Sequence, residues 1–159
     1  MMAVYAIIRI RGRVNTPNEV EKTLKLLRLV KKYHAAIYPS TLPGLKDMLN
    51  KAKDWITWGE ISQDALSELL RKRGRTATGD PLTDEFVEKH LGLKGGIEAL
   101  SKAIMSGEIA YHRLKHVEKV FRLHPPKGGL KGSIKKPYND GGELGYRNGD
   151  INHLLKRMI

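Results

Sequence analysis

The change of hydrophobic period along residues 4–61 constrains the fold of this chain more than any other feature. The first stretch, VYAIIRIR (4–11), alternates apolar and other residues, which predicts a strand with one buried face and a basic end. From residue 17 the spacing changes to that of a helix, with Val20, Leu24 and Leu27 on one side. Apolar runs at 33–38 and 55–61 predict two further strands, and 41–52 a second amphipathic helix.

Residues typical of turns and helix ends separate these elements. Thr16 is expected to cap the first helix, with Pro17 at its first position and Glu19 closing a capping box. Pro39 stops the second strand, Thr41 is expected to cap the second helix, and Pro43 falls in its first turn. The order is therefore β-α-β-α-β, which predicts an α/β (α+β) core whose sheet is backed by two helices.

The remaining chain has a helical middle and a basic end. Residues 62–110 form a helical extension: Ser62 caps one helix, a second runs from Thr83 to about His90, and a third spans 96–106 before Gly107. Residues 111–159 begin with a fourth strand at 117–123. No regular structure is expected over 124–149, which is rich in glycine and lysine, and a basic helix closes the chain at 150–158.

Positive charge is concentrated at the two ends of the chain. The net charge is +12, made up of +6 over residues 1–61, −1 over 62–110 and +7 over 111–159. This distribution predicts a polyanionic partner, and the lack of a helix-turn-helix pattern favours RNA over duplex DNA. No apolar run approaches the roughly 20 residues of a membrane span, and the chain has no cysteine for a disulfide or thiolate metal site.

Enzymatic motifs are missing. The glycine-lysine stretches GLKGG (92–96) and GGLKGS (128–133) lack the spacing of a phosphate-binding P-loop. His112 and His116 have helical spacing but no third metal ligand nearby, and Ser133 lacks the strand-turn-helix setting of a nucleophile. The residues therefore predict no enzyme, no cofactor and no metal site.

Basic residues near strand ends and in the C-terminal segment are the candidate RNA contacts. Glycines there allow close approach of a phosphate chain, which lysines neutralise. The candidates from the residues alone are Arg9, Arg11, Arg13, Lys31, Lys32, Lys127, Lys131, Lys135, Lys136 and Arg147, with His124 as a residue that stacks on a base or donates to a phosphate.

Two regions resemble a known family. Residues 23–61, which include PGLKDMLNKAK, together with VYAIIRIRGRVN before them, are similar to the large-subunit ribosomal proteins of the L-thirty family, whose eukaryotic counterpart is L-seven. FRLHPPKGG (121–129), GGELG and INHLLKRM resemble the longer archaeal and eukaryotic form. The resemblance implies a ferredoxin-like core with an antiparallel sheet and a structural role in the cytoplasmic ribosome. It also implies contact with 23S-type and 5S rRNA and with neighbouring ribosomal proteins.

Carried over position by position, the resemblance adds Lys46 and Lys51 of the second helix and the loop from His124 to Gly129, including Gly128, to the RNA-facing set, with Lys22, Lys25 and Arg28 of the first helix as further candidates. Two alternatives stay open. One is an acylphosphatase-like small hydrolase, because RGRVN (11–15) has a faint likeness to its phosphate loop. The other is an RNA-binding regulator outside the ribosome. The C-terminal segment is expected to order as it wraps RNA.

Overall fold

The computed structural model describes residues 3–159 and contains one six-stranded sheet with the strand order β4-β2-β1-β3-β6-β5. β1 pairs antiparallel with β2 and β3, and β2 pairs antiparallel with β4, whereas β6 joins β3 in parallel and β5 joins β6 in parallel. The strands are β1 Val4–Arg9, β2 His34–Pro39, β3 Ile56–Glu60, β4 Phe121–Arg122, β5 Ser133–Pro137 and β6 Gly142–Tyr146.

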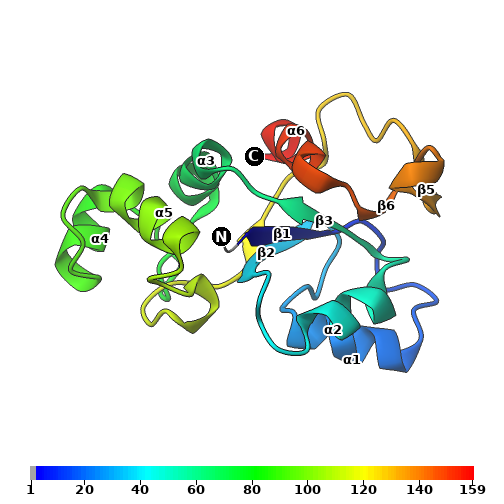
Figure 1. The fold of residues 1–159 in the computed structure, drawn as a ribbon, viewed down its shortest axis with the longest axis horizontal. Helices are drawn as coiled ribbons and strands as arrows, with labels where there is room; N and C mark the ends of the chain where they lie inside the picture. The colour runs from blue at the N-terminus through cyan, green and yellow to red at the C-terminus, as the bar shows by residue number, and fades with distance from the viewer. Residues whose placement is uncertain (1–2) are drawn as a thin grey trace.

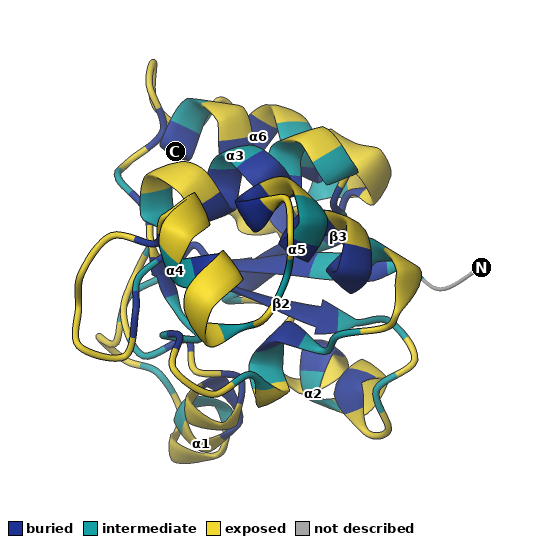
Figure 2. Ribbon diagram, turned by 90° about the vertical axis from the view of Figure 1, so that its left-hand side faces the viewer, coloured by how far each residue is buried: buried dark blue, intermediate teal, exposed yellow. Residues whose placement is uncertain are grey.

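Helices cover both faces of this sheet (Figure 1). The two helices α1 and α2 lie on one face, while α3 and α6 lie on the other, with α4 and α5 beyond α3 (Figures 1 and 2). The α-helices are α1 Asn18–Leu26, α2 Leu45–Ala52, α3 Gln63–Arg73, α4 Asp84–His90, α5 Gly96–Ser106 and α6 Ile151–Met158. Three short 3-10 helices are η1 Tyr111–Arg113, η2 Tyr138–Asp140 and η3 Asn148–Asp150.

Each face of the sheet has its own apolar core. Ile7 of β1 packs with Leu24 of α1 and Leu49 of α2, whereas Ile8 packs in a larger core with Leu66 of α3 and residues of α5 and α6. The expected burial of β1 on a single face is therefore wrong, because helices from the middle and the end of the chain cover its second face. The middle residues pack on the sheet instead of standing apart from it.

Of the four helix starts predicted from a serine or threonine, two are correct, and α5 also begins at Gly96 as predicted, without a side-chain cap. The Ser62 hydroxyl accepts a hydrogen bond from the Ala65 N–H, and the Thr83 hydroxyl accepts one from the Phe86 N–H, as expected. The other two predictions are wrong. α1 begins at Asn18 with Pro17 at the N-cap position, and α2 begins at Leu45 after Gly44, which adopts a left-handed conformation at φ 79°.

The C-terminal segment differs most from expectation. The predicted strand at 117–123 is reduced to two residues, and the segment 124–149, expected to be irregular, contains β5 and β6. β5 has no buried residue and therefore no alternation to reveal it, while β6 is defined by its pairing to β3, over 80 residues earlier. Such non-local pairing leaves no local signature.

One glycine reorients the end of β6. Leu144 packs in the larger core, yet Tyr146, two residues later, contacts Tyr5 and Trp58 on the α1/α2 side of the sheet. Residues two apart in a regular strand share a face. Gly145 breaks this alternation because it adopts a left-handed conformation at φ 84°, which a side chain disfavours.

Candidate nucleic-acid interface

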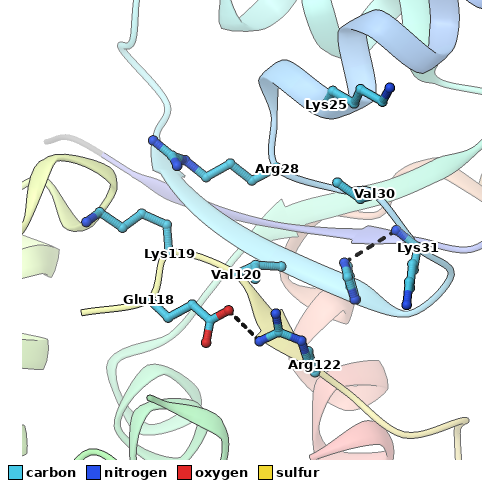
Figure 3. Close-up of a pocket in the computed structure, with 9 residues that line it drawn as sticks. Lys25, Arg28, Val30, Lys31, Glu118, Lys119, Val120 and Arg122 are labelled. Carbon is cyan, nitrogen blue, oxygen red and sulfur yellow. Dashed lines mark hydrogen bonds and ion pairs between the residues drawn. The ribbon is translucent and has the colours of Figure 1, made fainter. Parts of the chain in front are cut away.

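A pocket of about 500 Å³ lies at the β4 edge of the sheet, beside the C-terminal end of α1 (Figure 3). We call it the basic pocket. Its walls come from the end of α1 and the following segment, from the start of β2, and from the chain that enters β4. Its lining residues are Lys25, Arg28, Val30, Lys31, His34, Glu118, Lys119, Val120 and Arg122.

The local fold turns the charged side chains of this pocket outward. Leu27 and Leu29 are both buried in the core under α1, and Arg28 between them is exposed. Arg28 adopts a left-handed conformation at φ 67°, which ends α1 and turns the chain toward β2. On the opposite wall His34 is paired across the sheet with Arg122, so both side chains lie on the same face.

Cations dominate the basic pocket. Among the lining residues that the structure describes, five are lysine or arginine and one, Glu118, is acidic. The Glu118 carboxylate is already paired with the Arg122 guanidinium at 2.5 Å (Figure 3). The pocket therefore carries a net positive charge, which attracts an anion.

Two groups in the pocket show the effect of this environment on their pKa. Burial lowers the pKa of the His34 imidazole, and the nearby charges of Arg122, Lys31 and Arg9 lower it further. Burial likewise lowers the pKa of Lys119, with a further contribution from the charge of Arg28. An anion in the pocket would oppose these shifts, because it stabilises the protonated forms.

Arg9 was expected at the RNA surface, but its side chain is fully buried. Its guanidinium donates to the carbonyl oxygens of Leu29 at 2.8 Å and Val30 at 3.0 Å and to the Glu21 carboxylate at 2.6 Å. The assignment of Arg9 to an RNA-facing role is therefore corrected. Arg9 instead holds the segment that carries Val30 and Lys31, and so positions one wall of the basic pocket.

Arg147 is also a buried residue, with 5% of its surface exposed. Its guanidinium donates to the Thr57 hydroxyl at 2.7 Å and to the Glu143 carbonyl at 2.6 Å, and it lies over the Tyr138 ring at 4.7 Å. Its prediction as an RNA contact is corrected in the same way. Arg147 ties β6 to β3. No local pattern indicates this burial, since an arginine among glycines near the end of a basic chain has the pattern of a surface residue.

The other predicted residues of the core lie at the basic pocket, after β1 and on α2. Lys31 lines the basic pocket, and Lys32 lies next to it with its ammonium over the Tyr33 ring. Arg11 and Arg13 follow β1, with the Arg11 guanidinium stacked 5.0 Å from the Trp55 ring centre and Arg13 exposed.

The two predicted lysines of α2 are separate from the basic pocket. Lys51 is paired with Glu19 at 3.0 Å on an exposed surface, where an ion pair stabilises little. Lys46 lines a second pocket, described below.

The predicted loop after β4 is attached to α6. The Arg157 side chain donates to the carbonyl oxygens of Lys127 and Gly129, and the Lys127 N–H donates to the Arg157 carbonyl at 3.0 Å. The His124 ring lies between the carbonyl oxygens of Pro125 and Ile159. These contacts leave the side chains of Lys127 and Lys131, and the surface of Gly128, exposed to solvent.

Lys135 and Lys136 lie on β5, the outer strand of the sheet, and are exposed. Lysines on an edge strand also disfavour pairing with another chain. The structure thus buries Arg9 and Arg147 and brings Lys25, Arg28 and Lys31 into the basic pocket. The other predicted residues lie outside this pocket.

Sequence reasoning missed part of that pocket. His34, Lys119 and Arg122 were not predicted, and they meet Lys25 and Arg28 only because β4 pairs with β2 from some 90 residues further along the chain. The sequence feature that could have revealed these residues is the placement of Lys119 and Arg122 around a short apolar strand.

The described part of the chain shows neither a cluster of metal ligands nor a helix that could span a membrane. His112 lies in η1 and His116 in a left-handed turn, so they do not share a helix face. Residues 3–159 contain no group of three or more potential metal ligands of the histidine, cysteine or carboxylate type. Within the same residues, each helix is too short or too polar to cross a membrane.

The sheet and its cationic surface define a class, that of small, basic α+β proteins. Comparison with known proteins identifies the family within this class. The family model for ribosomal protein L30p/L7e matches residues 5–56. "Large ribosomal subunit protein uL30" of Staphylothermus marinus is 62% identical over 162 residues, covering all of both chains. The uL30 proteins of Aeropyrum pernix and Thermofilum pendens are 54% and 44% identical, each over 99% of this chain.

The chain belongs to the L30p/L7e family of ribosomal proteins. The resemblance seen in its sequence is thereby confirmed, as is the mixed α/β fold with its ferredoxin-like core. The family is a structural, non-enzymatic one, and the hydrolase alternative is wrong.

Proposed function

We propose that this protein is a component of the cytoplasmic large ribosomal subunit and binds its rRNA through the basic pocket and the exposed lysines around it. The names of its relatives support the ribosomal role. The observation that carries the RNA contact is the basic pocket itself, where five cations surround one carboxylate that is already paired.

The chemistry of the pocket suits a phosphate backbone. Arg28 and Arg122 offer planar guanidinium groups and Lys25 and Lys31 offer point charges, the two kinds of donor that phosphates accept. The exposed lysines of the loop after β4 and of β5 extend this contact along the chain of phosphates. Within this role we assign 23S-type and 5S rRNA as the ligands and other large-subunit proteins as the neighbours.

The test compares two double variants that remove the same charge. Arg28→Ala with Lys31→Ala removes two cations of the basic pocket, whereas Lys94→Ala with Lys102→Ala removes two exposed cations from the neutral middle of the chain. Binding to deproteinised archaeal large-subunit rRNA is measured from 50 to 400 mM salt. The pocket variant should reduce the log–log salt slope by about 1.5, since each phosphate contact contributes roughly 0.7–0.9.

The matched variant should bind rRNA as the unaltered protein does. Equal losses in both variants would show a general effect of charge and would contradict a role for the basic pocket. An affinity independent of salt would contradict the electrostatic mechanism as a whole.

The alternative of a regulator outside the ribosome is tested by sedimentation. Salt-washed large subunits should contain the protein in a one-to-one ratio to rRNA. Its absence from them, together with binding to other cellular RNA, would favour the regulator.

A further inference from the structure

A second pocket lies on the same face of the sheet as the basic pocket, on the far side of α2. The α1/α2 layer buries Ile56 at the start of β3 but leaves Trp58 and Tyr146 partly exposed, and a pocket of about 360 Å³ forms there. We call it the aromatic pocket. Its lining residues are Tyr5, Trp58 and Tyr146 of the sheet, Lys46, Leu49 and Asn50 of α2, and Ser40.

The three rings are arranged as a corner. Tyr146 stands edge-on to Tyr5 at an interplanar angle of 69° and is tilted by 41° to Trp58, with both pairs of ring centres 6.3 Å apart. Rings that pack on one another in a closed core bury their faces. Here Tyr146 remains 38% exposed, and Tyr5 and Trp58 are only partly buried, so ring surface faces solvent.

The structure holds this corner in place. Gly145 turns Tyr146 onto this face, and the Tyr146 hydroxyl donates a hydrogen bond to the Glu60 carboxylate. That hydrogen bond is the main cause of the rise in the pKa of Tyr146 to about 12. Arg147, the next residue, is fixed in the interior. Because its backbone and its hydroxyl are both fixed, the Tyr146 side chain has little freedom to rotate. Its ring is therefore a preorganised surface, which lowers the entropy lost on binding.

We propose that the aromatic pocket receives one unstacked base of the RNA, an inference that rests on the proposed function. Aromatic rings stack on bases, and proteins read RNA mainly at such splayed-out nucleotides. The Asn50 amide is suited to the hydrogen-bonding edge of a base, and the Lys46 ammonium to the adjoining phosphate. None of the lining residues is a carboxylate among those described, and the nearby Glu60 carboxylate accepts the hydrogen bond of the Tyr146 hydroxyl.

The two polar lining residues from α2 favour a base over an apolar side chain of a neighbouring protein as the occupant of the aromatic pocket. An apolar side chain would leave Lys46 and Asn50 without a role, whereas a nucleotide uses the rings and both polar groups. The pocket also shares its sheet face with the basic pocket, so one RNA strand crossing the α1/α2 layer can reach both.

The test uses the fluorescence of Trp58. The chain has two tryptophans, and Trp55→Phe leaves Trp58 as the only one. Titration of this variant with deproteinised large-subunit rRNA should quench and shift the Trp58 emission, because a base stacked in the pocket contacts its indole. Inorganic polyphosphate, which has charge but no bases, should bind without quenching.

A pair of substitutions at Tyr146 then separates the ring from its hydroxyl. Tyr146→Leu should weaken rRNA binding about 5- to 30-fold, the effect of losing one stacking surface, without changing the salt slope. Tyr146→Phe keeps the ring but loses the hydrogen bond to Glu60 that restricts it, so it should weaken rRNA binding much less than Tyr146→Leu does.

Several results would overturn the inference. Quenching by polyphosphate equal to that by rRNA would show an indirect effect, and equal losses in Tyr146→Leu and Tyr146→Phe would show that the ring does not stack. Salt-dependent rRNA binding with unchanged Trp58 emission would overturn the base pocket and leave the proposed function intact. If emission changed only in assembled subunits, a protein neighbour would be the occupant. Failure to bind rRNA at all would overturn both proposals.

Discussion

The two open margins of one sheet face differ sharply in chemistry. Both lie beside the same α1/α2 layer, one at the β2–β4 pair and the other at the β3–β6 pair. At the first margin the cross-strand pair is His34 with Arg122, and at the second it is Trp58 with Tyr146. Since paired residues share a face, the register of two short pairings decides that one margin is cationic and the other aromatic.

A buried arginine stabilises each margin. Arg9 holds the segment that lines the basic pocket, and Arg147 holds the strand that carries the aromatic pocket. The Arg9 guanidinium donates to carbonyl oxygens and the Glu21 carboxylate, and that of Arg147 donates to the Thr57 hydroxyl and to the carbonyl and carboxylate of Glu143. These acceptors make the burial of both charges tolerable. The surface chemistry of this protein therefore depends on charges that the solvent and the RNA do not reach.

The largest effect is expected from the substitution Arg9→Met. It leaves the Glu21 carboxylate and three carbonyl oxygens without their donor, and it should lower the free energy of unfolding by about 3–5 kcal/mol. Denaturant unfolding measures this loss. Adding Glu21→Leu should recover part of it. A loss below about 1 kcal/mol would show that Arg9 does not organise the basic margin.

The substitution Gly145→Ala tests the aromatic margin. A side chain at φ 84° is strained and should cost about 1–3 kcal/mol, although the added methyl group meets no neighbouring atom. Relief of the strain would turn Tyr146 away from Glu60, so the pKa of Tyr146 should fall from about 12 toward 10, as measured by NMR titration of the tyrosine rings.

Gly149→Ala is the matched control for this change. Gly149 also has open space around its missing side chain, but it does not adopt a left-handed conformation. It should leave both the stability and the pKa of Tyr146 nearly unchanged. An unshifted Tyr146 in Gly145→Ala would contradict the role of the glycine in reorienting the strand.

The pH dependence of rRNA binding distinguishes the two margins. In the free protein the pKa of His34 lies below 6.5, and a phosphate in the basic pocket should raise it. Binding is then coupled to the uptake of a proton by His34. Affinity should therefore increase as the pH falls from 6.5 toward the lower pKa of the free protein, by at most about tenfold per unit of pKa change.

His34→Ala should abolish this pH dependence, while Tyr146→Phe at the other margin should retain it. Binding measured at pH 5.5, 6.5 and 7.5 checks the trend. The stability of the free protein should change in the opposite sense. Because folding lowers the pKa of His34, its contribution is present above pH 6.5 and is lost as the pH falls through the folded value.

The smallest effect is expected for Lys51→Ala on α2, between the two margins. Its ion pair with Glu19 is exposed on both sides, so stability should change by less than about 1 kcal/mol. If the RNA strand crosses this layer, the salt slope of rRNA binding should fall by about 0.7–0.9. An unchanged slope would show that the strand takes another course between the pockets.

The local pattern of residue types predicted the core elements and the helices of the middle of the chain. It failed for features that depend on contacts between residues far apart in the sequence. β5 and β6 were missed because one has no buried face and the other is defined by its partner β3. Arg9 and Arg147 were assigned to the surface because sequence shows charge but not burial. The basic pocket was found only in part, because its walls come from residues 25–34 and 118–122, which are far apart along the chain.

The order of the core elements, the basic character of the two ends and the family can be predicted from the amino-acid sequence alone. These follow from periodicity, charge and motif, all of which are properties of residues close together along the chain. The tertiary structure sets which cations meet at one pocket, which arginines are buried and which rings form the aromatic corner. Those outcomes depend on strand pairing between β2 and β4 and between β3 and β6, where the pairing energy comes from residues about 90 positions apart.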